Sequence, residues 1–101
     1  MQLTPLKNEP WMLEVLNKAL ERGRLNIYDD GLRVSLQRSY ATHPEIKSHR
    51  DDHKGTYTVC ILESKALSGI GVAKLKPSDQ DNPRTGETIA LMRALENLRR
   101  K

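Results

Sequence analysis

Residue types that bind metal ions are concentrated between residues 43 and 53. This segment contains all three histidines of the chain and two adjacent aspartates, whose side chains offer nitrogen and oxygen ligands. Their spacing matches no standard zinc arrangement, and a solvated loop seldom holds a closed metal site. We therefore expect no metal and no cofactor. We interpret these side chains as a polar contact surface: His43, His49, Asp51, Asp52 and His53.

The sequence offers little for covalent or acid–base catalysis. Nucleophilic catalysis needs a thiol or hydroxyl beside a base, and Cys60 lies in the middle of a predicted strand, where a buried, inert thiol is the common case. Asp29 and Asp30 precede a glycine, which is typical of a turn. The segment GIGVAK lacks the Gly-Lys-Ser/Thr ending of a phosphate-binding loop. We expect a protein that is not an enzyme.

The composition limits the size and the location of the protein. A chain of 101 residues with 37% hydrophobic content suits one small core. We expect a short arm over residues 1–9 and a single domain over residues 10–101. One cysteine and no signal-peptide pattern favour the reducing cytoplasm. No apolar run approaches the roughly 18 residues of a membrane span, so we expect no membrane partner.

The first half of the chain predicts a helix, a turn and a strand. The segment from Asn8 to Pro10 marks a helix start, and Gly23 is placed to end that helix. Asp30-Gly31 predicts a turn, and residues 32–37 then alternate as in a strand with one wet face. We also predict a short strand over residues 25–27, before this turn. The predicted apolar helix face contains Met12, Leu13, Leu16, Ala19 and Leu20.

The second half predicts a long loop, two strands and a second helix. Residues 41–55 show no periodicity, whereas residues 56–63 carry apolar side chains on both faces, which indicates a central strand. Residues 64–68 form the expected hairpin loop into a strand that reaches Lys76. Gly69 and Gly71 of this strand allow another element to approach closely. Asn82 and Pro83 predict a helix start, and the apolar spacing continues through Leu91, Ala94, Leu95 and Leu98.

These elements predict an α+β fold. An antiparallel meander of three or four strands buries its apolar side best when the N-terminal and C-terminal helices pack on one face.

The net charge is +4, from 17 basic and 13 acidic residues. The last three residues, Arg99, Arg100 and Lys101, supply three of the positive charges. We interpret them as the solvated end of the last helix, where cations suit the helix dipole.

The order helix, three strands, helix resembles the double-stranded-RNA-binding domain. The C-terminal half is similar to a bacterial family of unknown function that shares this fold, and small bacteriophage proteins carry similar endings. That family's pattern is G-x-G-x-A-x-x-x-P-x-D, then Pro and Gly, then a helix with A-x-x-R-A-L. The matching residues are Gly69, Gly71, Ala73, Pro77, Asp79, Pro83, Gly86, Ala90, Arg93, Ala94 and Leu95.

This resemblance implies contact with nucleic acid. Domains of the classical type read duplex RNA with the first helix, the loop between the first two strands, and lysines at the start of the last helix. Here Arg84 alone stands where that lysine cluster is expected, and the long loop mixes both signs of charge. Our first hypothesis is a non-catalytic nucleic-acid-binding module. Its candidate contacts are Lys18, Arg22, Arg50, Lys54, Lys74, Lys76 and Arg84.

The second hypothesis belongs to another class, a phage-type accessory or inhibitor protein. Its partner would be a host protein, such as a nucleic-acid enzyme or a component of an anti-phage defence or CRISPR system. The mixed loop would then supply contacts and an aromatic side chain would anchor them. Trp11 has two interpretations, since it can also pack the first helical turn onto the core. The candidate contacts are Trp11, Tyr40, His43, His49, Arg50 and His53.

Overall fold

The computed structural model describes residues 3–25, 27–39, 56–75 and 83–101. Within these ranges, two helices and three long strands alternate with shorter elements. Their bounds are β1 Thr4–Pro5, the 3-10 helix η1 Leu6–Asn8, α1 Pro10–Glu21, β2 Arg33–Ser39, β3 Thr56–Glu63, β4 Leu67–Leu75, α2 Pro83–Glu96 and β5 Arg99–Arg100.

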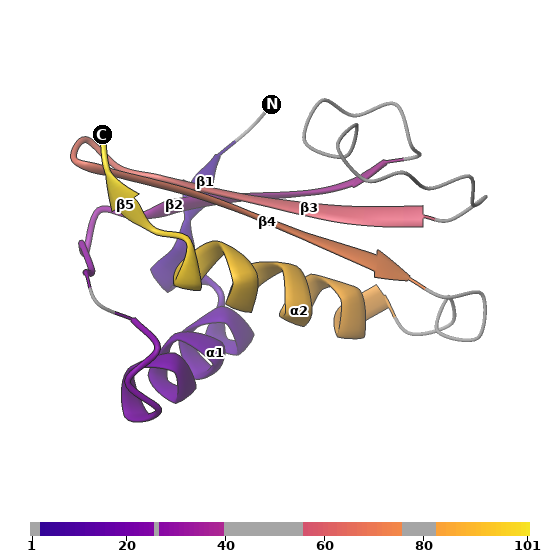
Figure 1. Ribbon diagram of the computed structural model, residues 1–101, viewed down its shortest axis with the longest axis horizontal. Helices are drawn as coiled ribbons and strands as arrows, with labels where there is room; N and C mark the ends of the chain where they lie inside the picture. The colour runs from indigo at the N-terminus through magenta and orange to yellow at the C-terminus, as the bar shows by residue number, and fades with distance from the viewer. Residues whose placement is uncertain (1–2, 26, 40–55, 76–82) are drawn as a thin grey trace.

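The strands form one antiparallel sheet in the order β1-β2-β3-β4-β5, and both helices lie on the same side of it (Figure 1). This arrangement confirms the predicted α+β fold. The central strand is β3, which pairs with β2 over residues 33–39 and with β4 over residues 67–75. Cys60 and Leu62 point toward the helices, and Tyr57 and Val59 point the other way; all four are buried.

The sheet has two short edge strands that the sequence patterns did not predict. Within the predicted N-terminal arm, Thr4 and Pro5 pair with Val34 and Arg33, and Leu6 is only 1% exposed. The predicted short strand over residues 25–27 is wrong, because Leu25 and Ile27 belong to no strand of the described chain. Both side chains instead pack, partly buried, against the core.

Helix α1 ends as its glycine predicted. Gly23 has a φ of 65°, in the left-handed region that glycine enters readily. The N–H groups of Gly23 and Arg24 donate to the carbonyls of Leu20 and Ala19, which is the Schellman pattern of helix termination. One predicted core residue is wrong: Leu20 is 48% exposed. The buried stripe instead runs through Met12, Val15, Leu16 and Ala19.

Helix α2 lies directly against β3 and β4, and α1 packs against α2. The contact depends on Gly69 and Gly71 of β4. A Cβ atom on Gly71 would overlap the Ala90 carbonyl and the Ala94 amide, and one on Gly69 would lie 2.6 Å from the Ala94 carbonyl oxygen. The close approach predicted for these glycines is therefore confirmed. The predicted side chains Leu91, Ala94, Leu95 and Leu98 are all buried in the core.

The chain beyond α2 differs from the prediction. The helix ends at Glu96, and Arg99 and Arg100 form β5 opposite Ser68 and Leu67. Interpreting these two arginines as a helix end is therefore wrong. Directly after the helix, the side-chain Nδ2 of Asn97 donates to the Ile70 carbonyl at 2.9 Å, and this bond ties the chain to the edge of β4.

The turn between β3 and β4 is shorter than predicted. Strand β4 already begins at Leu67, and the Ser64 hydroxyl accepts hydrogen bonds from the N–H groups of Ala66 at 3.3 Å and Leu67 at 3.0 Å. Ser64 is only 7% exposed, so this hydroxyl fixes a tight turn from within. Among the described helices, none combines the length and apolar character needed to cross a membrane.

Candidate functional site

Two of the predicted nucleic-acid contacts are engaged in ion pairs. Lys18 pairs with Glu14 at 3.6 Å along α1. Arg84 pairs with Glu87 at 3.2 Å, and its guanidinium lies 4.1 Å from the centre of the Trp11 ring. Arg84 therefore joins the first turns of the two helices. A phosphate would have to draw it away from both partners.

The other predicted contacts are dispersed or lie outside the described residues. Arg22 is exposed at the end of α1, whereas Lys74 is exposed near the opposite end of the sheet, paired in register with Tyr57. Trp11 is partly buried and packs against the core, so its interpretation as a packing residue is confirmed. The contacts outside the described ranges are Tyr40, His43, His49, Arg50, His53, Lys54 and Lys76.

A charged row crosses the face of the sheet opposite the helices, hereafter the open face. The strand register places Pro5, Arg33, Glu63, Ser68 and Arg99 side by side across all five strands. This row lies at the end of the sheet where the β3–β4 turn and the chain terminus meet (Figure 1). Charged residues up to 66 sequence positions apart, Arg33, Glu63 and Arg99, thus lie in one row. That is why the pattern of any one segment does not reveal them.

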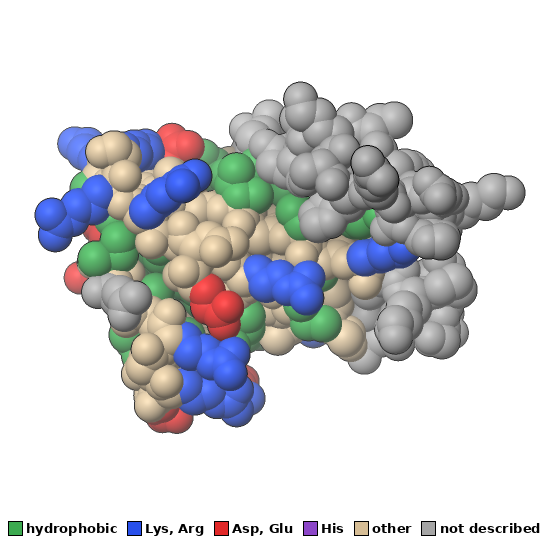
Figure 2. Space-filling view, in the orientation of Figure 1, with side chains coloured by type: hydrophobic (Ala, Val, Ile, Leu, Met, Phe, Trp, Pro, Cys, Tyr) green, Lys and Arg blue, Asp and Glu red, His purple; other side chains and the backbone are tan. Residues whose placement is uncertain are grey.

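The C-terminal residues present their cations to three neighbouring hollows. Arg99 lines a hollow with Ser68 and Asn97, and Arg100 lines a larger one on the other side of β5 with Tyr28 and Asp30. Lys101 extends over the β3–β4 turn, where its N–H donates to the Ala66 carbonyl at 2.9 Å. Alternation along a strand explains this distribution. Figure 2 shows several lysine and arginine side chains gathered at this end of the molecule.

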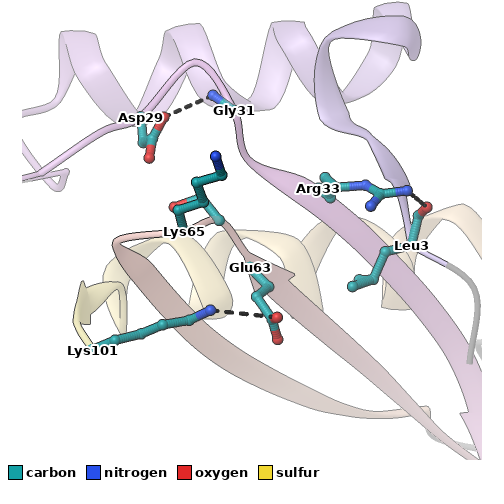
Figure 3. A pocket seen from close by; sticks show the side chains of 8 residues that line it. Leu3, Asp29, Gly31, Arg33, Glu63, Lys65 and Lys101 are labelled. Carbon is teal, nitrogen blue, oxygen red and sulfur yellow. Dashed lines mark hydrogen bonds and ion pairs between the residues drawn. The ribbon is translucent and has the colours of Figure 1, made fainter.

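One groove at this end has side chains from four parts of the chain, and we call it the hairpin groove (Figure 3). Its volume is about 480 Å³. Lys65 extends from the β3–β4 turn toward Asp29 and Gly31, and Lys101 crosses to Glu63, with 3.4 Å between the ammonium and the carboxylate. The groove is lined by Leu3, Asp29, Gly31, Arg33, Glu63, Ser64, Lys65 and Lys101.

The charges of the hairpin groove are held in different ways. The Arg33 guanidinium donates to the Leu3 carbonyl at 2.8 Å, which fixes the N-terminal segment beside β2. The Asp29 carboxylate accepts the Gly31 N–H at 2.8 Å. This bond, and a second one with the Ser64 hydroxyl, lower the pKa of Asp29 below its ordinary 3.8. Lys65 forms no ion pair or hydrogen bond with the described part of the chain. Its ammonium is therefore available to a ligand.

Cys60 does not line this groove. Cys60 has no exposed surface, and burial raises the pKa of its thiol to about 12, so the thiol stays protonated and unreactive. Its prediction as a buried thiol is confirmed. Residues 43–53 lie outside the described ranges, and inside those ranges no group of three or more His, Cys, Asp and Glu side chains is placed to hold a metal ion.

Sequence reasoning missed the cations that this end of the sheet brings together. A signal for each is visible in retrospect. Arg33 alternates with buried Leu32 and Val34, which placed it on the open face, and Lys65 occupies a hairpin tip. Asn97 is a common residue just after a helix end, which would have separated Arg99 to Lys101 from α2. No single-segment pattern pairs β5 with β4, because that pairing depends on the fold.

Comparison with known families agrees with the likeness seen in the C-terminal half. A model of the Rv2632c-like family matches residues 41–101, which include β3, β4, α2 and β5. The chain belongs to this family of small proteins, whose function is unknown. Neither a curated protein nor a solved structure matches the chain. Family membership therefore does not indicate an activity, and the function has to be inferred from the site.

Proposed function

We propose that this protein is a non-catalytic binding module that contacts nucleic acid with the end of the sheet formed by the β3–β4 turn and β5. The observation that carries the proposal is the position of the C-terminal cations. Strand β5 returns them to the turn, where they meet Lys65 and Arg33. We call this set of side chains the cationic hairpin end: Arg33, Lys65, Arg99, Arg100 and Lys101.

The charges at this end favour a polyanion. Within the described part of the chain, Lys65, Arg99 and Arg100 have no carboxylate in an ion pair with them. Glu63 lies among them, but Lys101 pairs with it and offsets its charge. Lysine and arginine side chains that neutralise phosphates release bound counterions, which supplies most of the affinity of such surfaces. The cationic hairpin end therefore has the electrostatics of a phosphate-contacting surface.

The fold gives independent but weaker support. Helix α1, three long antiparallel strands and α2, with both helices on one side, follow the order that the resemblance to double-stranded-RNA-binding domains predicts. Shared architecture is an argument by analogy, since unrelated functions occur on one fold. The surfaces differ as well, because Arg84 at the start of α2 is occupied by Trp11 and Glu87. We accordingly propose the hairpin end as the main contact, in the cytoplasm that the single cysteine favours.

The second hypothesis, a phage-type accessory protein that binds a host protein, depends on other residues. Its anchor Trp11 is packed against the core and covered by Arg84. Its remaining contacts, in residues 40–53, lie outside the described ranges. The described surface therefore favours nucleic acid, and binding to a protein is kept as an outcome of the test.

The test is a fluorescence-anisotropy titration of labelled oligonucleotides at two salt concentrations with three proteins. We expect the wild type to bind. The logarithm of its affinity should fall linearly with the logarithm of the salt concentration, with a slope set by the few phosphates that the protein neutralises. Lys65→Glu should weaken binding at least fivefold. The matched charge reversal Lys18→Glu, on the exposed side of α1, should change it less than twofold.

Two results would contradict the proposal. If the folded wild type bound no oligonucleotide at low salt, the proposal would be wrong, and the protein-binding hypothesis would take its place. Should Lys18→Glu weaken binding as much as Lys65→Glu, the contact would lie on the helices instead. Circular dichroism of each variant establishes that a loss of binding is not a loss of fold.

A further inference from the structure

We infer that the hairpin groove binds a single strand of nucleic acid, with a preference for bases that carry an amino group. This inference rests on the proposed function and specifies the ligand of the same site. Three features of the groove support it: its concave shape, its mixture of charges, and the fixed position of one carboxylate.

The shape of the groove suits one strand. Concave sites of roughly 300–1,000 Å³ enclose ligands of small-molecule size, and the hairpin groove, at about 480 Å³, lies within that range. A nucleotide of a single strand can enter such a hollow with its sugar and base. A duplex presents a convex surface with its bases stacked inside, so it can touch only the rim.

The mixture of charges points the same way. The groove is lined by three cations, Arg33, Lys65 and Lys101, but also by the carboxylates of Asp29 and Glu63. Double-stranded DNA carries about one negative charge per 1.7 Å of its axis. Lys101 offsets the charge of Glu63, but a duplex laid across the groove would bring phosphates against the Asp29 carboxylate, which is in no ion pair within the described part of the chain. A single strand spaces its phosphates more widely, and between them it offers hydrogen-bond donors that carboxylates can accept.

Asp29 is the carboxylate best placed to accept such a donor. Its Oδ1 accepts the Gly31 N–H at 2.8 Å, and this bond is the main cause that lowers the pKa of the carboxyl below its ordinary value. Lys65 extends toward it from the facing turn (Figure 3). A phosphate on Lys65 and an amino group on Asp29 would therefore engage neighbouring parts of one nucleotide.

This arrangement distinguishes among bases. Carboxylate side chains accept hydrogen bonds from exocyclic amino groups such as N4 of cytosine. Uracil and thymine have no amino group. In a single strand these base edges are unpaired and open to side chains. Cytosine-containing strands should therefore bind more tightly than uracil-containing strands of equal length and charge.

The experiment compares four labelled ligands by fluorescence anisotropy at pH 7.5: a single-stranded C12 RNA, a U12 RNA, and duplex RNA and duplex DNA of twelve base pairs. We expect C12 to bind at least threefold more tightly than U12 and at least fivefold more tightly than either duplex. Asp29→Asn keeps the side-chain oxygen of the turn but removes the charge. It should bring the C12 and U12 affinities within about twofold of each other.

The outcomes separate this inference from the proposed function. Lys65→Glu should weaken binding of C12 and U12 equally, because it acts on phosphate. If a duplex bound as tightly as C12, or if U12 equalled C12 in the wild type, the inference would be wrong while nucleic-acid binding stood. If none of the four ligands bound the folded protein, the proposed function itself would fail, and this inference with it.

Discussion

The guanidinium of Arg84 lies 4.1 Å from the centre of the Trp11 ring. These two residues are 73 positions apart, and the contact joins the first turn of α1 to the first turn of α2. A cation over an aromatic face contributes roughly 0.5–1 kcal/mol at an exposed site. Arg84 therefore contributes to the packing of the helices, although its position in the sequence resembles that of a phosphate-binding lysine.

Replacing Arg84 with alanine should accordingly lower stability more than binding. We expect Arg84→Ala to lose about 1 kcal/mol of unfolding free energy, because the contact with Trp11 and the pair with Glu87 are both removed. The fluorescence of Trp11, the one tryptophan of the chain, should change as its ring loses the cover. Urea unfolding and emission spectra measure both effects. A fivefold loss of nucleic-acid affinity without a change in emission would contradict this assignment.

The second prediction concerns the close contact between β4 and α2. Gly71→Ala should destabilise the protein by roughly 1–3 kcal/mol or more, since the added methyl group would overlap the helix backbone at Ala90 and Ala94. The control is Gly31→Ala, where the nearest atom to the new methyl group is a carboxylate oxygen of Asp29 at 3.2 Å. Equal urea midpoints for the two variants would show that α2 does not lie so close to the sheet.

Two buried hydroxyl groups make a matched pair for the third prediction. Within the described structure, Thr58 Oγ1 is buried with no hydrogen-bond partner, whereas the Ser64 hydroxyl accepts two N–H groups. Thr58→Val should leave stability unchanged or raise it by about 1 kcal/mol, because an unsatisfied buried hydroxyl is removed. Ser64→Ala should lower it by about 1 kcal/mol. Thermal unfolding of both proteins measures the difference, and the opposite order would refute the hydrogen bonding described.

The fourth prediction follows from the raised pKa of Cys60. Burial moves this pKa from 9.0 to about 12, so between pH 7 and 9 the folded protein keeps a neutral thiol. Above pH 9 the unfolded chain ionises first, and this thiol then favours unfolding as pH rises. We expect a thiol reagent at pH 8 to label Cys60 only as fast as the protein opens, with a steep increase across the urea transition. Rapid labelling of the native protein would mean that the strand is accessible.

Much of the fold was predictable because its signals are local. Gly23 ends α1 through its own backbone conformation, and alternation of apolar side chains marked the three long strands. The glycines of β4 indicated that another element packs closely against this strand, and that element is α2. Each of these features depends on a few adjacent residues, and such features can be read from a sequence.

The candidate site was not predictable in the same way. Pairing of β2 with β3 brings Asp29 and Arg33 to the turn that carries Lys65, and Lys101 joins them only once β5 has paired with β4. The apolar spacing of α2 continues to Leu98, and Leu98 is indeed buried, but the helix has already ended at Glu96. Burial and helical conformation are separate properties, and the sequence pattern reports only the first. Glu96, the last residue of the helix, pairs with Arg24 at 3.1 Å.

We propose that the cationic hairpin end is the surface that contacts nucleic acid. It is tested most directly by recording amide chemical shifts of labelled protein during titration with the C12 single strand. We expect the largest changes at Gly31, at residues 63–68 and at residues 99–101. Changes confined to α1 and the first turn of α2, with the hairpin end unaffected, would contradict it.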